Sequence, residues 1–128
     1  MQTKSTDHYA EYVVAWRERE KLTRRHILDR AAQARQLSES CADLLVEMHH
    51  VRHVWLFGSL LLPQDVHARS DVDLAVEGLA PADYFTALAA LYELVGPGIE
   101  IDLVAMETAQ STLRQHILSE GLTLYAAT

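Results

Sequence analysis

The spacing of apolar residues divides the chain near residue 50. Before that point, apolar side chains recur at steps of three and four residues, as on one face of an amphipathic helix. Neither glycine nor proline occurs before Gly58, so no strong breaker interrupts this pattern. The first fifty residues are therefore predicted to be helical. The apolar positions are Tyr9, Val13, Trp16, Ile27, Ala31, Ala34, Leu37, Cys41, Leu44, Leu45 and Met48.

The length of this helical segment raises a question of packing. A single helix over residues 7 to 49 would be about 65 Å long at 1.5 Å per residue, which is more than so small a domain can cover. Either the helix breaks near Leu22 and Thr23, where Thr23 caps a second helix, or part of it projects. A projecting amphipathic helix needs a partner, whereas the alternative is packing on this protein's own sheet.

After residue 50 the period of the pattern changes. Short apolar or alternating stretches predict strands, and a stretch with helical spacing is stopped by the Gly96-Pro97-Gly98 turn. The predicted order is α, β, β, α, β, α, which describes a small α+β domain with a mixed sheet of about three or four strands flanked by helices. Residues 1–50 form the helical segment of this organisation, and residues 51–128 form its core. The predicted elements of the core are strands at 53–57, 70–76 and 99–104, helices at 81–95 and 108–119, and a closing segment at 120–125.

Composition adds limits on the class of protein. A chain of 128 residues with 49% hydrophobic residues suits one globular domain. The single cysteine, Cys41, cannot form an internal disulfide. No apolar run approaches the roughly 18 to 20 residues that span a bilayer, and the N-terminus lacks the apolar region of a secretory signal. We expect a cytoplasmic protein without a membrane segment.

The net charge of −7 is unevenly distributed. Residues 1–50 hold eight basic and eight acidic side chains, whereas residues 51–128 hold three basic and ten acidic ones. Because nucleic acid binding rests on lysine and arginine contacts to phosphates, direct binding of nucleic acid is not expected. A core this acidic can bind a nucleotide only if a cation intervenes.

Candidate chemistry lies where the predicted strands carry carboxylates. Side chains two apart on a strand share a face, so Asp71 and Asp73 project together, and Asp102 joins them if the third strand lies beside the second. Such carboxylates repel one another unless a cation lies between them, and Mg²⁺ prefers these oxygen ligands together with substrate phosphates. Gly58 permits close backbone approach and Ser59 adds a hydroxyl, so this turn is a candidate phosphate site.

The ordered set of these motifs resembles the DNA polymerase β-like nucleotidyltransferases, and within them the minimal nucleotidyltransferase (MNT) family. The resemblance covers about residues 50–126. It implies AMP transfer from ATP with two Mg²⁺ ions held by Asp71, Asp73 and Asp102, with Asp102 assisting as general base and Gly58 and Ser59 binding phosphate. The matching segments are Leu56-Phe57-Gly58-Ser59, Ser70-Asp71-Val72-Asp73-Leu74, Ile101-Asp102-Leu103-Val104 and Glu120-Gly121-Leu122-Thr123-Leu124-Tyr125.

The same resemblance implies a partner. Many members of the family are antitoxins that bind a HEPN ribonuclease toxin in a hetero-oligomer and AMPylate it on tyrosine. This chain departs from the family pattern in two ways. Leu60-Leu61-Leu62-Pro63 follows Gly58-Ser59 where the family usually has a segment with arginine and glycine. Eleven residues, rather than the usual ten, separate Ser59 from Asp71. Two alternatives to an AMP-transferring antitoxin therefore stay open. One is an antitoxin that neutralises its toxin by binding alone, and the other is a transferase for a small hydroxylated molecule.

Overall fold

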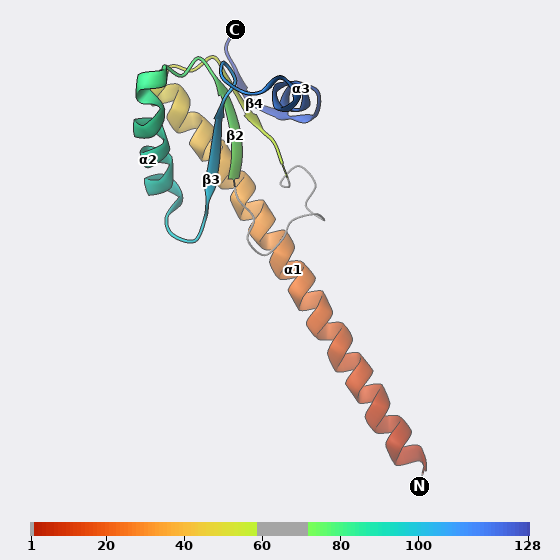
Figure 1. Ribbon diagram of the computed structural model, residues 1–128. Helices are drawn as coiled ribbons and strands as arrows, with labels where there is room; N and C mark the ends of the chain where they lie inside the picture. The colour runs from red at the N-terminus through yellow and green to blue at the C-terminus, as the bar shows by residue number, and fades with distance from the viewer. Residues whose placement is uncertain (1, 59–71) are drawn as a thin grey trace.

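The computed structural model describes residues 2–58 and 72–128 of the chain. Within them, a four-stranded sheet has helices on both of its faces (Figure 1). The α+β fold expected from the sequence is therefore confirmed. In chain order the elements are α1 (Gln2–His49), β1 (His53–Leu56), β2 (Val72–Glu77), a 3₁₀ turn (Pro81–Asp83), α2 (Tyr84–Val95), β3 (Ile101–Ala105), α3 (Ser111–Glu120) and β4 (Leu122–Ala126).

The order of the strands places the second and third side by side. The sheet runs β3-β2-β1-β4, so β3 forms one edge and β4 the other. β1 pairs antiparallel with both β2 and β4, whereas β2 and β3 are parallel and are joined through α2. Four strand limits within the described residues differ from the sequence expectation. β1 ends at Leu56 rather than Phe57, β2 extends to Glu77 rather than Val76, and β3 runs from Ile101 to Ala105 rather than from Ile99 to Val104.

One face of the sheet carries the larger hydrophobic core. Inward-pointing side chains of β1, β2 and β3, such as Leu56, Leu74 and Leu103, pack with Leu45 of α1 and Leu91 of α2. Among the α1 side chains that the structure describes, Ala34 is the first that is buried, so the helix contacts this core through its last part. Full burial of one leucine side chain stabilises the fold by about 1.5–3 kcal/mol. The face is therefore held by a small number of large aliphatic contacts between sheet and helices.

α1 is one continuous helix of 48 residues, and its N-terminal part projects from the core (Figure 1). The break considered near Thr23 is absent from this helix. The Thr23 hydroxyl instead donates to the carbonyl of Arg19, four residues earlier, at 2.9 Å, which is a contact within a helix and not a cap. The helix ends at His49 because His50 adopts a positive φ of 53°. No helix in the described part of the chain is both long and apolar enough to cross a membrane.

Candidate active site

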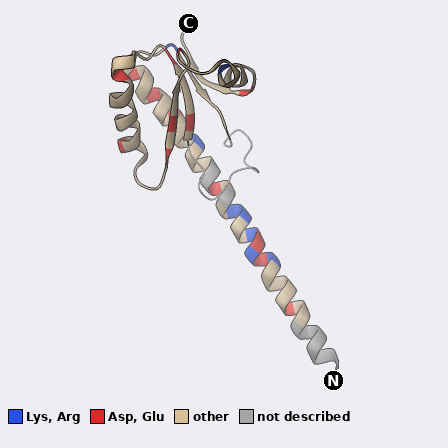
Figure 2. Cartoon of the chain, viewed as in Figure 1, with Lys and Arg blue, Asp and Glu red and all other residues tan. Residues whose placement is uncertain are grey.

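Two carboxylates occupy neighbouring positions on the parallel strands. Asp73 of β2 and Asp102 of β3 are Cα partners in the register, so both side chains project from the same face of the sheet. Adjacent strands are about 4.8 Å apart, which brings the two groups within reach of one cation. Asp102 is exposed and Asp73 is half-buried. Figure 2 shows acidic positions side by side on these strands. The conditional expectation that β3 lies beside β2 is confirmed.

The turn after β1 lies directly against Asp73. Gly58 has a φ of 86°, and a Cβ atom built there would overlap Oδ2 of Asp73 and lie 3.0 Å from its Cγ. The backbone N–H of Phe57 also donates to the Asp73 carbonyl at 3.0 Å. Both the backbone conformation and the lack of space therefore require glycine at position 58. The close approach at this turn is to the Asp73 carboxylate, and the phosphate contact expected of Gly58 stays a prediction.

α3 covers the other part of the same face. Trp55 of β1, Ala75 of β2 and Ile117 of α3 are buried in a second, smaller core, and Val104 of β3 packs against it. Ala75 and Val104 lie two residues after Asp73 and Asp102 on their strands, and Trp55 is the partner of Ala75 on β1. α3 therefore does not cover Asp102, which is exposed to solvent.

Tyr84, at the start of α2, lies close enough to Asp102 for the carboxylate to affect the pKa of its phenol. Burial first, and then the neighbouring Asp102 carboxylate and Tyr92 phenol, raise the pKa of the Tyr84 phenol above its ordinary value of 10.0. The Tyr84 hydroxyl donates to the carbonyl oxygen of Leu103, the residue after Asp102, at 2.6 Å. Tyr84 thus fixes the backbone of β3 beside the carboxylate.

Three of the five residues singled out from the sequence are brought together: Gly58, Asp73 and Asp102. The other two, Ser59 and Asp71, lie outside the described residues, as do Leu60 to Pro63. The three-carboxylate cluster with Asp71 therefore stays a prediction. Among the residues that are described, no group of three or more metal-ligating side chains occurs.

Tyr84 and Tyr92 were not recognised as site residues from the sequence. Both contribute to the apolar spacing of a helix, which hides the use of their hydroxyl groups. Their separation of eight residues was the available signal, because positions i and i+8 lie close to one face of a helix and both hydroxyls can then reach one neighbouring element.

Similar solved structures come from toxin–antitoxin complexes. A complex with AMP-PNP has a chain that matches with a TM-score of 0.58 and 23% identity, covering 70% of this chain and 74% of that one. A complex of a tri-AMPylated Shewanella oneidensis HEPN toxin with its MNT antitoxin matches with a TM-score of 0.55 and 20% identity, covering 73% of each chain. An MntA–HepT complex matches with a TM-score of 0.54 and 24% identity, covering 72% and 73%. At these identities the likeness shows the fold.

The sequence comparisons identify the family. No curated protein gives a significant match to the chain. A family model described as polymerase beta, nucleotidyltransferase, matches residues 39–128, which include the sheet and the Asp73–Asp102 pair but exclude most of α1. The chain belongs to this polymerase β nucleotidyltransferase family.

Proposed function

We propose that this protein is a Mg²⁺-dependent nucleotidyltransferase that transfers AMP from ATP to a tyrosine hydroxyl of a HEPN-type toxin, and that it thereby acts as an antitoxin in the cytoplasm. The observation that carries this proposal is the in-register pair of Asp73 and Asp102 beside the Gly58 turn, in a chain of the polymerase β nucleotidyltransferase family. The similar complexes, one with AMP-PNP and one with an AMPylated HEPN toxin, support the choice of nucleotide and acceptor.

The donor atoms of the site suit a hard cation. Carboxylate oxygens are the protein ligands that Mg²⁺ prefers, and Asp102 is exposed enough to accept one together with substrate. Asp73 and Asp102, with Asp71, would hold two Mg²⁺ ions in this proposal. When bound, Mg²⁺ offsets the charge of the triphosphate and lowers the pKa of an acceptor hydroxyl.

The proposed reaction is one in-line displacement at the α-phosphorus. The tyrosine oxygen forms a bond to the α-phosphorus, the bond from that phosphorus to the bridging oxygen breaks, and pyrophosphate leaves with that electron pair. The carboxylate of Asp102 takes the hydroxyl proton. Gly58 lets the backbone lie close to the phosphates, and the phenol of Tyr84 holds β3 in position through Leu103. Positioning and charge neutralisation supply most of the rate.

The projecting part of α1 is proposed to bind the toxin. Its apolar side chains Tyr9, Tyr12 and Trp16 are 71%, 64% and 52% exposed, and they lie outside the segment shared with the family. Tyr9 and Trp16 are seven residues apart, so they share one face of the helix. Aromatic side chains are the commonest anchors of protein interfaces. In this proposal the core carries the catalytic site, and the projecting N-terminal part of α1, here called the arm, holds the partner.

A second function is favoured by one feature of the sequence. Leu60-Leu61-Leu62-Pro63 stands where the family usually has a segment that contains arginine, and loss of that arginine would remove one phosphate contact. The corresponding function is neutralisation of the toxin by binding alone. It uses the same partner and the same arm but requires no transfer of AMP.

Incubation with radiolabelled ATP, Mg²⁺ and the protein encoded beside this chain's gene separates these functions. Label on the partner's tyrosine supports AMP transfer, a stable complex without label supports binding alone, and label only on small hydroxylated compounds supports a small-molecule transferase. The double variant Asp71→Asn, Asp73→Asn and the single variant Asp102→Asn are expected to abolish transfer while leaving the thermal unfolding midpoint nearly unchanged. Undiminished transfer by either variant would refute the assignment of these carboxylates.

The matched control removes carboxylates elsewhere. The double variant Glu93→Gln, Glu120→Gln changes the net charge by the same amount at two exposed positions on α2 and α3. Transfer by this control is expected to equal that of the unmodified protein, so a loss in both double variants would point to a general charge effect.

A further inference from the structure

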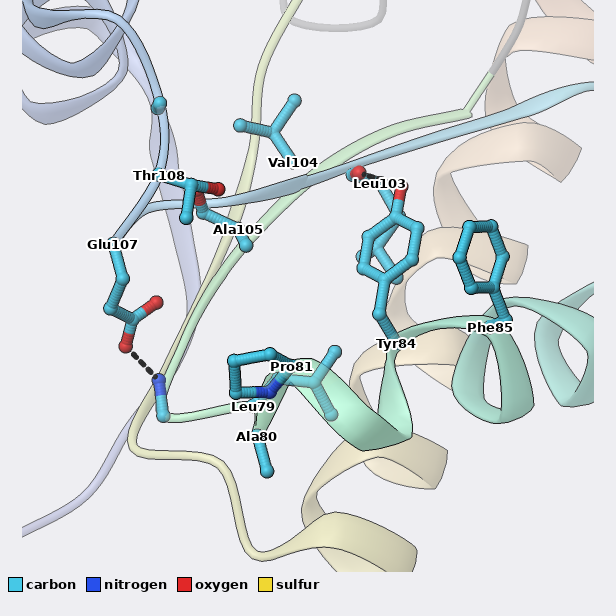
Figure 3. A pocket seen from close by; sticks show the side chains of 12 residues that line it. Leu79, Ala80, Pro81, Tyr84, Phe85, Leu103, Val104, Ala105, Glu107 and Thr108 are labelled. Carbon is cyan, nitrogen blue, oxygen red and sulfur yellow. Dashed lines mark hydrogen bonds between the residues drawn. The ribbon is translucent and has the colours of Figure 1, made fainter.

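An apolar groove of about 720 Å³ lies along the free edge of the sheet, beside the C-terminal half of β3 (Figure 3). Its walls come from Leu79 and Pro81 after β2, from Tyr84 and Phe85 at the start of α2, and from Leu103 and Ala105 of β3. This volume lies within the range of about 300–1,000 Å³ typical of ligand sites. The Phe85 ring is 78% exposed and meets Tyr84 edge-to-face at 5.2 Å, so one aromatic wall of the groove faces solvent.

The edge of β3 beside this groove has already used several of its outward backbone groups. The Tyr84 hydroxyl donates to the carbonyl of Leu103, and the Ile101 N–H donates to the Tyr92 hydroxyl at 3.1 Å. The carbonyl of Ala105 accepts from the backbone N–H of Thr108 at 3.2 Å. Because an added strand needs these groups, pairing of a peptide with this edge is blocked. The groove is therefore suited to side chains and not to a strand.

The groove lies at the β3 edge of the sheet, the edge from which an acceptor must come, and its α2 wall is on the opposite face from the Asp102 carboxylate. In an in-line displacement the attacking and leaving oxygens are on opposite sides of the phosphorus. The Gly58 turn, the phosphate site of the proposed function, lies against Asp73 on β2, and β1 and β4 close the sheet beyond it. Asp102 is on the edge strand, and beyond that strand the sheet is open. An acceptor hydroxyl opposite the leaving pyrophosphate thus enters over β3.

Acidic groups surround the groove. Glu107 lines the groove with its side chain 45% exposed, and it accepts the Gly78 N–H at 2.8 Å and lies 3.9 Å from Arg52. Asp83, directly before Tyr84, is 52% exposed and lies 3.9 Å from His49. Asp102 lies directly before Leu103 and is also exposed. An acceptor segment that reaches the groove therefore gains from lysine or arginine near its apolar anchor.

From these features we infer that the groove receives an apolar side chain of the protein acceptor, in a basic segment next to the hydroxyl that is modified. This inference rests on the proposed function and adds a specificity site to it. Burial of one large side chain against Phe85 and Leu79 anchors the acceptor so that its hydroxyl stays over Asp102. Positioning of this kind lowers KM for the protein acceptor and leaves the binding of ATP unchanged.

The test is a steady-state comparison of AMP transfer to the HEPN-type protein encoded by the neighbouring gene. Phe85→Ala removes the exposed aromatic wall, and Phe85→Leu retains an apolar side chain there. Leu94→Ala, two and a half turns further along α2 on its opposite side and 42% exposed, is the matched control. We expect Phe85→Ala to raise KM for the acceptor about tenfold, as loss of an interface anchor does, with kcat and KM for ATP unchanged. Phe85→Leu and Leu94→Ala should remain close to the unmodified protein.

The possible outcomes separate the inference from the function on which it rests. If the unmodified protein labels the acceptor and Phe85→Ala does so with unchanged KM, the groove inference is wrong and the proposed function stands. If KM for ATP rises instead, the groove holds the nucleotide and the inference is equally overturned. If the unmodified protein labels no tyrosine of the partner at all, the proposed function itself has failed.

Discussion

Substitution of Gly58 by alanine tests whether the turn after β1 positions the Asp73 carboxylate. The new methyl carbon would occupy the space of Oδ2 of Asp73 and lie 3.0 Å from its Cγ and 3.3 Å from its Cβ. Rotation of the carboxylate alone relieves the first overlap but leaves the Cβ contact tight. The carboxyl group must therefore move on the order of 1 Å, a displacement that can cost about a hundredfold in rate.

The magnitude has two separable parts. An alanine at a φ of 86° costs about 1–2 kcal/mol in backbone strain. A hundredfold loss of rate corresponds to about 2.7 kcal/mol of transition-state stabilisation. The second part depends on the contact with Asp73, whereas the first does not.

Gly98 supplies the control for the backbone part. Its φ of 88° is nearly the same, and an added Cβ would meet nothing within 4 Å. Gly98→Ala is thus expected to lower the unfolding midpoint by roughly 4–8 °C but to leave AMP transfer unchanged. Gly58→Ala is expected to lower the midpoint by at least as much. Thermal melts and initial rates with labelled ATP measure the two effects on the same preparations.

One result would refute this reasoning. If Gly58→Ala loses stability to the same extent as Gly98→Ala and still transfers AMP within about threefold of the unmodified rate, then the contact with Asp73 does not control the site. The carboxylate would have to be positioned by some other neighbour.

Three further substitutions or deletions test the fold and the arm. Burial raises the pKa of the Cys41 thiol from 9.0 to about 11, so the unfolded thiol ionises first and the free energy of unfolding should fall by about 2 kcal/mol as pH rises from 9 to 11. Urea titrations should show this loss in the unmodified protein and a smaller one in Cys41→Ala, and equal pH dependence in both would contradict the assignment. Leu45→Ala, at a fully buried position, should lower the free energy of unfolding by about 2–5 kcal/mol, whereas Met48→Ala, at a side chain that is 55% exposed, should change it by about 0.5 kcal/mol or less. Deletion of residues 2–22 should leave the melting midpoint within a few degrees but weaken binding of the toxin at least tenfold by calorimetry, and unchanged affinity would show that the arm does not bind it.

The sequence predicted the elements of this fold better than it predicted their contacts. Alternation in the second and third strands placed Asp73 and Asp102 correctly on one face, because the period of two along a strand follows from backbone geometry alone. Their adjacency depended on strand order, which no local pattern determines. The parallel register through α2 supplies it.

The behaviour of α1 shows a different limit. The lack of glycine and proline before Gly58 correctly predicted helix. Of the two alternatives left open for its length, the structure has the projecting segment and not the break at Thr23. Helix propagation needs no contact with a core once local propensity is sufficient. The hydrogen bonds from Tyr84 and Tyr92 to the backbone of β3 could not be predicted from local sequence, because only the tertiary structure brings the edge of β3 to their hydroxyls.

The length of the uninterrupted helix α1 also sets the distance between the core and the exposed tip of the arm. From Ala34, the first buried side chain among those described in α1, to Tyr9 near the tip are 25 residues of helix, or about 38 Å at 1.5 Å per residue. A stiff connection raises the effective concentration of a bound partner only at sites that its own dimensions allow it to reach. A toxin bound at the tip of α1 must therefore be large enough to span this distance if its tyrosine is to reach the active site of the same chain. The tyrosine of a smaller toxin could reach only the active site of a second copy of the chain. The length of one uninterrupted helix would thus decide between modification within a pair and modification between pairs.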